Sequence, residues 1–156
     1  MRVRRLAMLL SGLAPNPSDS VELEQYATEG DLAARWLVDI VAFGDLTEGC
    51  TVADLGAGNG VLGLGSLEMG SGRVILVEAD QAACDVAKSN AESMGFADSV
   101  EVICATLGSD QIDLGPVGHA RVADEDRFDQ RRAGARHPIH EDGALVPKAR
   151  WLELGQ

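Results

Sequence analysis

Three glycines and two acids near the middle of the chain are the residues best placed to bind a ligand. Gly56, Gly58 and Gly60 alternate with other residues directly after a short apolar run. Glycine has no Cβ atom, so a turn with this spacing can be tight and its backbone can lie against a ligand. Asp54 comes just before the turn, and Glu78 ends a second apolar run, at the offset of about 20 residues where nucleotide-binding α/β folds carry a ribose-binding carboxylate. The pattern predicts a site for a nucleoside-containing cofactor.

The charge and spacing of the turn indicate which cofactor fits. Turns that bind dinucleotides have the spacing Gly-x-Gly-x-x-Gly, which this turn lacks. Asp54 would repel a phosphate group but suits a cationic or hydroxyl-bearing ligand, and a helix after the turn would offer backbone N–H groups to polar atoms. A methionine-derived sulfonium cofactor therefore fits better than NAD. A glycine-rich turn without a ligand is the alternative, because one glycine motif is a weak signal.

These residues are predicted to lie in alternating strands and helices. Apolar runs typical of buried strands alternate with helical patterns. The predicted strands are Val52–Leu55, Val74–Glu78 and Val100–Cys104, and the helices between them are Val61–Glu68 and Gln81–Met94. Such alternation builds βαβ units on a parallel sheet. We therefore predict a three-layer α/β, Rossmann-like fold with a central parallel sheet.

Two further helices are predicted before this unit. Arg4–Leu13 is amphipathic and ends ahead of two prolines, which cannot continue a helix. Leu32–Phe43 has apolar residues at helical spacing, with Asp31 as its predicted N-cap. On this pattern we expect Trp36 and Phe43 to pack in the core.

The composition is that of a single globular domain. The chain has 156 residues, of which 46% are hydrophobic, and no apolar run approaches the roughly 20 residues of a bilayer span. The apolar run after the N-terminal arginines is too short for a signal peptide, so we expect a cytoplasmic protein without a membrane partner. The net charge of −12 disfavours nonspecific binding to nucleic acid, so an RNA substrate would need a local basic patch or a basic partner. Cys50, Cys84 and Cys104 lack metal-ligand spacing and are predicted to be small buried residues.

The pattern changes after Val117. Residues 1–117 contain 6 Lys and Arg and 18 Asp and Glu, whereas residues 118–156 contain 7 of each. No strand or helix period runs through the second part. We therefore predict a cofactor-binding part, 1–117, and an atypical tail, 118–156, that packs poorly. His137 and His140 lie in this tail, and no metal site is predicted because nothing fixes their geometry.

Together, the turn, the acid after the second strand and the order of elements resemble the class I methyltransferases that use S-adenosylmethionine. The block Leu23-Glu-Gln-Tyr-Ala-Thr28, followed by Ala33-Ala-Arg35, narrows the resemblance to the archaeal and eukaryotic adenine-N6 methyltransferases of small-subunit ribosomal RNA. The resemblance implies S-adenosylmethionine as cofactor and ribosomal RNA as substrate, and it leaves open a small activator protein as partner. It also implies seven cofactor-binding residues, which hold the methionine part, the ribose and the cofactor's other side in that order: Asp54, Gly56 and Gly58; Glu78; Gln25, Tyr26 and Thr28.

The chain departs from this family at two places. The family has an acid directly after the third strand to receive the adenine amino group, but here Ala105 stands there and Asp110 would have to substitute. The family also carries Asn-Pro-Pro-Phe after the fourth strand, whose polar atoms accept the hydrogens of the target amine while the Phe stacks on the flipped base. No Asn-Pro-Pro occurs in this chain. We therefore assign no catalytic residue and expect a fold that is incomplete at its C-terminus and impaired in methyl transfer.

The missing motif has two explanations. Gly118-His-Ala-Arg121 can be encoded as GGA-CAC-GCT-CGT, which read one base later begins Asp-Thr-Leu, as expected of the strand before the motif. Either the tail, which we predict to be disordered if it does not pack, is the product of a shifted reading frame, or the protein is genuinely divergent or truncated. The functional alternatives are a noncatalytic S-adenosylmethionine-binding module and a methyltransferase acting on a protein or small molecule, because the cofactor half does not specify the acceptor.

Overall fold

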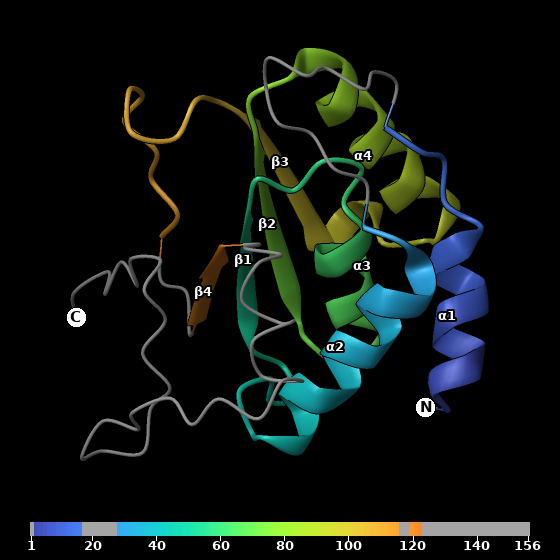
Figure 1. Ribbon diagram of the computed structural model, residues 1–156. Helices are drawn as coiled ribbons and strands as arrows, with labels where there is room; N and C mark the ends of the chain where they lie inside the picture. Colours follow the sequence, from blue (N-terminus) through green and yellow to red (C-terminus); the bar gives the residue numbers. More distant parts are fainter. Residues whose placement is uncertain (1, 17–27, 116–118, 123–156) are drawn as a thin grey trace, which may run out of the picture.

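The computed structural model of the chain describes residues 2–16, 28–115 and 119–122, the last four by their backbone alone. Helices and strands alternate through these residues (Figure 1). In chain order they are α1 (Val3–Ser11), α2 (Gly30–Ala42), β1 (Thr51–Leu55), α3 (Val61–Glu68), β2 (Arg73–Glu78), α4 (Gln81–Ser93), the 3₁₀-helix η2 (Ala97–Ser99), β3 (Val100–Cys104) and β4 (His119–Val122). None of the described helices is long and apolar enough to cross a membrane.

The four strands form one parallel sheet in the order β3-β2-β1-β4. The chain moves outward from β1 to β2 and β3, and then returns to the other side of β1 for β4. In open parallel sheets, ligands bind beyond the carboxyl ends of the strands where the strand order reverses in this way. The predicted parallel α/β fold is confirmed, and its switch point lies at the end of β1.

Strand β4 lies in the part of the chain predicted to be an atypical tail. Its backbone pairs with β1 in parallel register, from Val52 opposite His119 to Leu55 opposite Val122. Its four residues, His-Ala-Arg-Val, alternate polar and apolar side chains, but this run is too short a signal to predict a strand in a segment without a longer period. The strand forms by pairing with β1. Residues 116–118 and 123–156 lie outside the described residues, and for them the predicted division of the chain stays a prediction.

All four described α-helices lie on the same side of the sheet, with α1 packed on the outside against α2 (Figure 1). Val74 and Leu76 of β2 pack on this face against α3 and α4, whereas Ile75 and Val77 point to the other face, where Leu114 packs against them. The second helical layer of the predicted three-layer fold is not among the described residues.

Helix α3 approaches the sheet and its neighbouring helices closely because two of its residues are glycines. A Cβ atom on Gly63 would collide with Leu76 and Val74, and one on Gly65 would collide with Leu37 and crowd Leu10. These glycines cost helix stability, but they allow α3 to fit between the sheet and helices α1 and α2.

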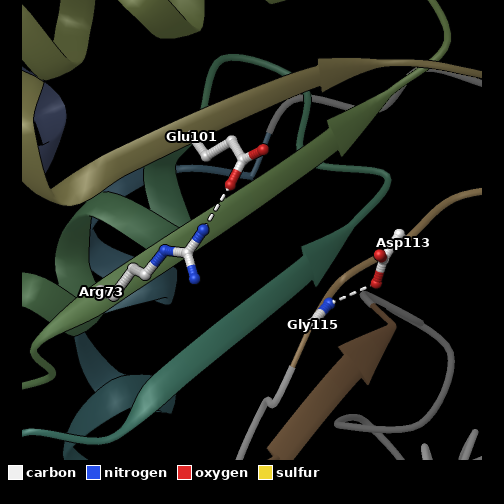
Figure 2. Close-up of polar contacts among 4 residues, drawn as sticks. All are labelled: Arg73, Glu101, Asp113 and Gly115. Carbon is white, nitrogen blue, oxygen red and sulfur yellow. Dashed lines mark hydrogen bonds and ion pairs between the residues drawn. The ribbon is translucent and has the colours of Figure 1, made fainter.

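Two polar contacts lie at the periphery of the sheet, one between β2 and β3 and one in the loop after β3 (Figure 2). Arg73 at the start of β2 pairs with Glu101 of β3 at 2.5 Å, with both side chains about half exposed, and such surface pairs contribute about 0–1 kcal/mol. The Asp113 carboxylate accepts a hydrogen bond of 2.8 Å from the Gly115 N–H. This turn brackets Leu114, which is buried against the sheet.

Several local predictions need correction. Helix α2 begins at Gly30 with Glu29 as its N-cap, so Asp31 lies in the first turn, where it pairs with Arg35 at 2.7 Å. Trp36 is buried as predicted, but Phe43 is 64% exposed. The helix ends at Ala42 and Phe43 is its C-cap residue, at the end of the core-facing stripe rather than within it.

The cysteines also differ from their common prediction. Cys84 is buried, Cys50 is partly buried and Cys104 is exposed. Cys104 is the last residue of β3, which forms one edge of the sheet. A strand at that position has a partner on one side only, so its final side chain is left uncovered.

Candidate cofactor site

The glycine-rich turn leaves the carboxyl end of β1 with three residues in the left-handed region. Gly56, Gly58 and Gly60 have φ values of 84°, 54° and 84°, which side chains with a Cβ atom rarely adopt. A Cβ atom on Gly60 would meet Leu76 and Leu64, whereas one on Gly56 would meet no described residue within 4 Å. The turn therefore packs on the core at Gly60 and is open at Gly56, where its backbone is accessible to a ligand.

The end of β2 holds the turn in place. The N–H groups of Gly56 and Ala57 both donate to the carbonyl oxygen of Val77, at 2.9 and 3.0 Å. The next N–H group, that of Gly58, donates to Oε2 of Glu78 at 2.7 Å. The sequence offset of 20 residues between these two positions thus corresponds to direct contact.

The carboxylate of Glu78 is buried and multiply bonded. It is 8% exposed, and its Oε1 accepts hydrogen bonds from the N–H groups of Ala79 at 2.7 Å and Asp80 at 3.0 Å. A carboxylate has about four acceptor positions, and the three backbone donors leave room for a further donor such as a hydroxyl group. Charge-assisted bonds of this kind fix the position of the group.

Asp54 accepts a hydrogen bond from the first turn of α3. It is 5% exposed, and its Oδ2 accepts a hydrogen bond of 3.0 Å from the N–H of Gly63. Asn59 accepts from the N–H of Val61 at 3.3 Å. Both N–H groups belong to the first turn of α3, where they have no partner within the helix, so the prediction that the helix start offers its N–H groups to a ligand is wrong at these two positions.

The structure brings together four of the seven predicted cofactor-binding residues. Asp54, Gly56, Gly58 and Glu78 meet at the carboxyl ends of β1 and β2. Thr28 is partly buried ahead of α2, and no hydrogen bond between described residues joins it to the turn. Gln25 and Tyr26 lie outside the described residues.

The region after β3 differs from the family pattern as the sequence indicated. The N–H of Ala105 donates to the carbonyl oxygen of Glu78 at 2.9 Å. Asp110 is exposed, and its Oδ2 accepts a hydrogen bond of 2.6 Å from the N–H of Thr106. Asp110 thus closes its own loop, and a role for it in adenine binding has no support from this contact.

A buried thiol lies directly behind the Glu78 backbone. The Sγ of Cys84 donates to the carbonyl oxygen of Glu78 at 3.5 Å. Burial, a hydrogen bond with the thiol of Cys104 and the charge of Glu78 raise the pKa of Cys84 to about 12. Cys84 is therefore a neutral thiol at physiological pH and is unsuited to act as a nucleophile.

Two residues of this region were missed by sequence reasoning. Asn59 lies within the turn, and Asn90 lies on α4 with 3% exposure. The available signal was the position of Asn90 on the buried stripe of α4, whose other members are Ala83, Cys84, Ala87 and Ala91. A polar residue in an apolar stripe needs a buried partner.

Comparison with known proteins shows the family of the chain. Residues 32–116 match the family model described as ribosomal protein L11 methyltransferase (PrmA), which is more than half of the chain. The chain belongs to this family. It is thus a class I, S-adenosylmethionine-dependent methyltransferase by family, and S-adenosylmethionine is the cofactor of this class.

Three relatives illustrate the extent of the similarity. An uncharacterized protein of Methanocaldococcus jannaschii is 32% identical over 161 residues, covering 99% of this chain and 68% of that protein. A ribosomal protein L11 methyltransferase of Pelotomaculum thermopropionicum is 46% identical over 59 residues, 38% of this chain and 19% of that enzyme. The crystal structure of a candidate RNA methyltransferase from Pyrococcus horikoshii is similar with a TM-score of 0.61 and 42% identity, covering 66% of this chain and 50% of that one. The chain therefore spans about two thirds, a fifth and half of these relatives respectively.

Proposed function

We propose that this chain binds S-adenosylmethionine at the glycine-rich turn and belongs to the RNA adenine-N6 type of methyltransferase, acting on ribosomal RNA. The observation that carries the proposal is the bond between the Glu78 carboxylate and the Gly58 N–H. It places a buried acid with spare acceptor capacity beside the open backbone of Gly56, at the switch point of a parallel sheet.

The residues divide between the two ends of such a cofactor. The open backbone at Gly56 suits the methionine part, and Glu78 suits a ribose hydroxyl, which donates to a carboxylate. Asp54 contributes negative charge beside the turn, which favours a cationic sulfonium over a phosphate. Thr28, Gln25 and Tyr26 are proposed contacts on the other side by their motif alone.

An RNA acceptor is supported by the similarity to the candidate RNA methyltransferase of P. horikoshii. Arg2, Arg4 and Arg5 at the start of α1 are exposed and offer a local basic patch on an otherwise acidic chain. The adenine-N6 and ribosomal RNA assignments rest on the block Leu23–Thr28. A small activator protein with a basic surface is a further proposed partner.

Methyl transfer by this chain is expected to be impaired. Without the Asn and prolyl oxygens of Asn-Pro-Pro-Phe, no described group holds the target amine in line with the sulfonium methyl. Orientation of two reactants contributes several kcal/mol to the barrier reduction, up to about 7–11 kcal/mol in well-oriented systems. We expect cofactor binding without appreciable turnover.

Two alternatives are supported by particular observations. The family model is named for a methyltransferase of a ribosomal protein, and a net charge of −12 favours a basic protein acceptor over RNA. The absence of Asn-Pro-Pro favours a noncatalytic binding module.

A methyl-transfer assay separates these functions. Tritium from labelled S-adenosylmethionine would be followed into small-subunit ribosomal RNA and, separately, into ribosomal proteins. The comparison uses this chain and a version whose reading frame is shifted by one base after Val117. We expect no transfer by the chain itself and transfer to RNA by the shifted version. Transfer to protein alone by either version would overturn the RNA assignment, and rapid transfer to RNA by the chain itself would overturn the predicted impairment.

A further inference from the structure

A buried asparagine links three segments that are distant in the sequence. The side chain of Asn90 accepts a hydrogen bond from the N–H of Ala14 at 2.9 Å and donates to the carbonyl oxygen of Ala14 at 3.0 Å. It also donates to the carbonyl oxygen of Asn59 at 3.0 Å. The side chain thus joins α4 to the segment after α1, 76 residues away, and to the glycine-rich turn, 31 residues away.

The turn contributes a second bond to the same segment. The side-chain amide of Asn59 donates to the carbonyl oxygen of Ala14 at 2.9 Å, so this one carbonyl accepts from both asparagines. We call Ala14, Asn59 and Asn90 the clasp. The segment it holds, Leu13–Asn16, is here called the strap.

The far end of the strap lies on the turn. A Cβ atom added to Gly58 would come within 3.0 and 3.3 Å of the side-chain amide atoms of Asn16. At its near end, Leu13 packs against the hydrophobic clusters on both sides of α3. The strap therefore covers the same glycine whose N–H is bonded to Glu78.

We propose that Asn90 is a positioning residue for the cofactor site, because it clasps the strap against the glycine-rich turn and so holds the turn in its binding conformation. This inference rests on the proposed cofactor binding at the turn. Asn90 itself is 3% exposed and acts through Asn59 and the strap.

The chemistry of the clasp gives it this role. Without the Asn90 amide, the N–H of Ala14 loses its acceptor, and the carbonyl oxygens of Ala14 and Asn59 each lose one donor. Buried polar groups without partners favour conformations in which water reaches them. In those conformations the strap leaves the turn. The apparent affinity for a ligand then falls with the fraction of molecules whose turn is in the binding conformation.

Four variants of the full chain test the inference. Asn90→Ala removes the clasp. Asn90→Asp keeps the shape and the acceptor oxygen of the side chain but loses both N–H donors. Ala14→Pro removes the N–H that donates to Asn90 without altering α4. Ser93→Ala is the matched control, since the Ser93 hydroxyl donates to the Asn90 backbone carbonyl at 2.8 Å on the same helix and has no bond to the strap.

Two readouts separate positioning from general stability. Calorimetric titration with S-adenosylhomocysteine should give dissociation constants about tenfold higher for Asn90→Ala and Asn90→Asp, severalfold higher for Ala14→Pro, and unchanged for Ser93→Ala. Amide hydrogen exchange should be about tenfold faster at Ala14 and Gly58 in the Asn90 variants, with unchanged rates in β2.

The possible failures are distinguishable. Failure of the unaltered chain to bind the cofactor would refute the proposed function, and the inference with it. Binding by the unaltered chain with equal affinity in Asn90→Asp and Ala14→Pro would overturn the inference alone. Uniformly faster exchange over the whole chain would also overturn it, since that result assigns Asn90 a purely structural role.

Discussion

At the scale of single residues, Glu78 connects the architecture of the turn to its chemistry. Its three backbone donors come from the turn on one side and from the segment after β2 on the other. The same carboxylate that shapes the site is the group proposed to receive the ribose. Its loss should therefore affect the ligand more strongly than the fold, provided that its replacement has a similar shape.

Glu78→Gln is expected to weaken the binding of S-adenosylmethionine by about tenfold to a hundredfold. The amide keeps one acceptor oxygen but loses the charged second acceptor available to a ribose hydroxyl, and the loss of such a bond typically costs about 1–3 kcal/mol. Isothermal titration of the purified variant measures the change. The control is Glu68→Gln at the end of α3, and an unaltered dissociation constant for Glu78→Gln would exclude Glu78 from the site.

The two neighbouring thiols should differ in reactivity. Because burial and its neighbours raise the pKa of Cys84 to about 12, only about one molecule in ten thousand carries its thiolate at pH 8. Iodoacetamide at that pH should modify the exposed Cys104 and leave Cys84 unmodified until the chain is unfolded. Peptide mass spectrometry measures both sites, and equal rates at the two cysteines in the native state would contradict the burial of Cys84.

At the scale of the elements, α3 packs closely against its neighbours because Gly63 and Gly65 have no side chains. A methyl group on Gly65 would require Cδ1 of Leu37, and to a lesser extent the Cδ atoms of Leu10, to shift. The helix gains little from intrinsic propensity, and its stability comes from packing against the sheet and two other helices.

Gly65→Ala should destabilise the chain despite the better helix propensity of alanine. Overpacking a close contact costs about 1–3 kcal/mol, whereas the propensity gain is at most about 1 kcal/mol. Thermal unfolding followed by circular dichroism should show a lower melting temperature than that of the parent. Glu92→Ala at an exposed position of α4 is the control, and a melting temperature above that of the parent for Gly65→Ala would show that the neighbouring leucines can move aside.

The elements set by local signals were predictable, and those set by distant contacts were not. Val61–Glu68 and Val100–Cys104 match their predictions because a glycine-rich turn and an apolar run with clear ends mark their boundaries. Strand β4 is stabilised by pairing with β1, and the alternation within its own four residues is too short a signal to predict this. The clasp joins residues 76 positions apart. Only Asn90 could have been noticed in the sequence, because it is a polar residue on an apolar stripe of α4.

For the candidate site, the same division holds. The spacing between the turn and Glu78 could be predicted because the turn directly follows β1 and Glu78 ends β2, and the ends of neighbouring parallel strands lie together. The hydrogen bond from the Gly63 N–H to Asp54 could not be predicted from the sequence, because it depends on how α3 packs above the end of β1.

At the scale of the whole molecule, the sheet order and the charge act together. The strand order reverses at β1, so the turn lies where open parallel sheets bind their ligands. The first 117 residues carry three times as many acidic as basic residues, 18 against 6. An overall field of this sign favours a cationic cofactor and disfavours ligands with several phosphates.

The central claim is that the glycine-rich turn and Glu78 form an S-adenosylmethionine site. The most direct test is a calorimetric titration of the full chain with S-adenosylmethionine and S-adenosylhomocysteine, and in parallel with NAD⁺ and ATP. The account predicts binding of the first two at one site and no measurable binding of the phosphate-bearing ligands. Absence of binding by both S-adenosyl compounds, or binding of NAD⁺ with equal affinity, would contradict it.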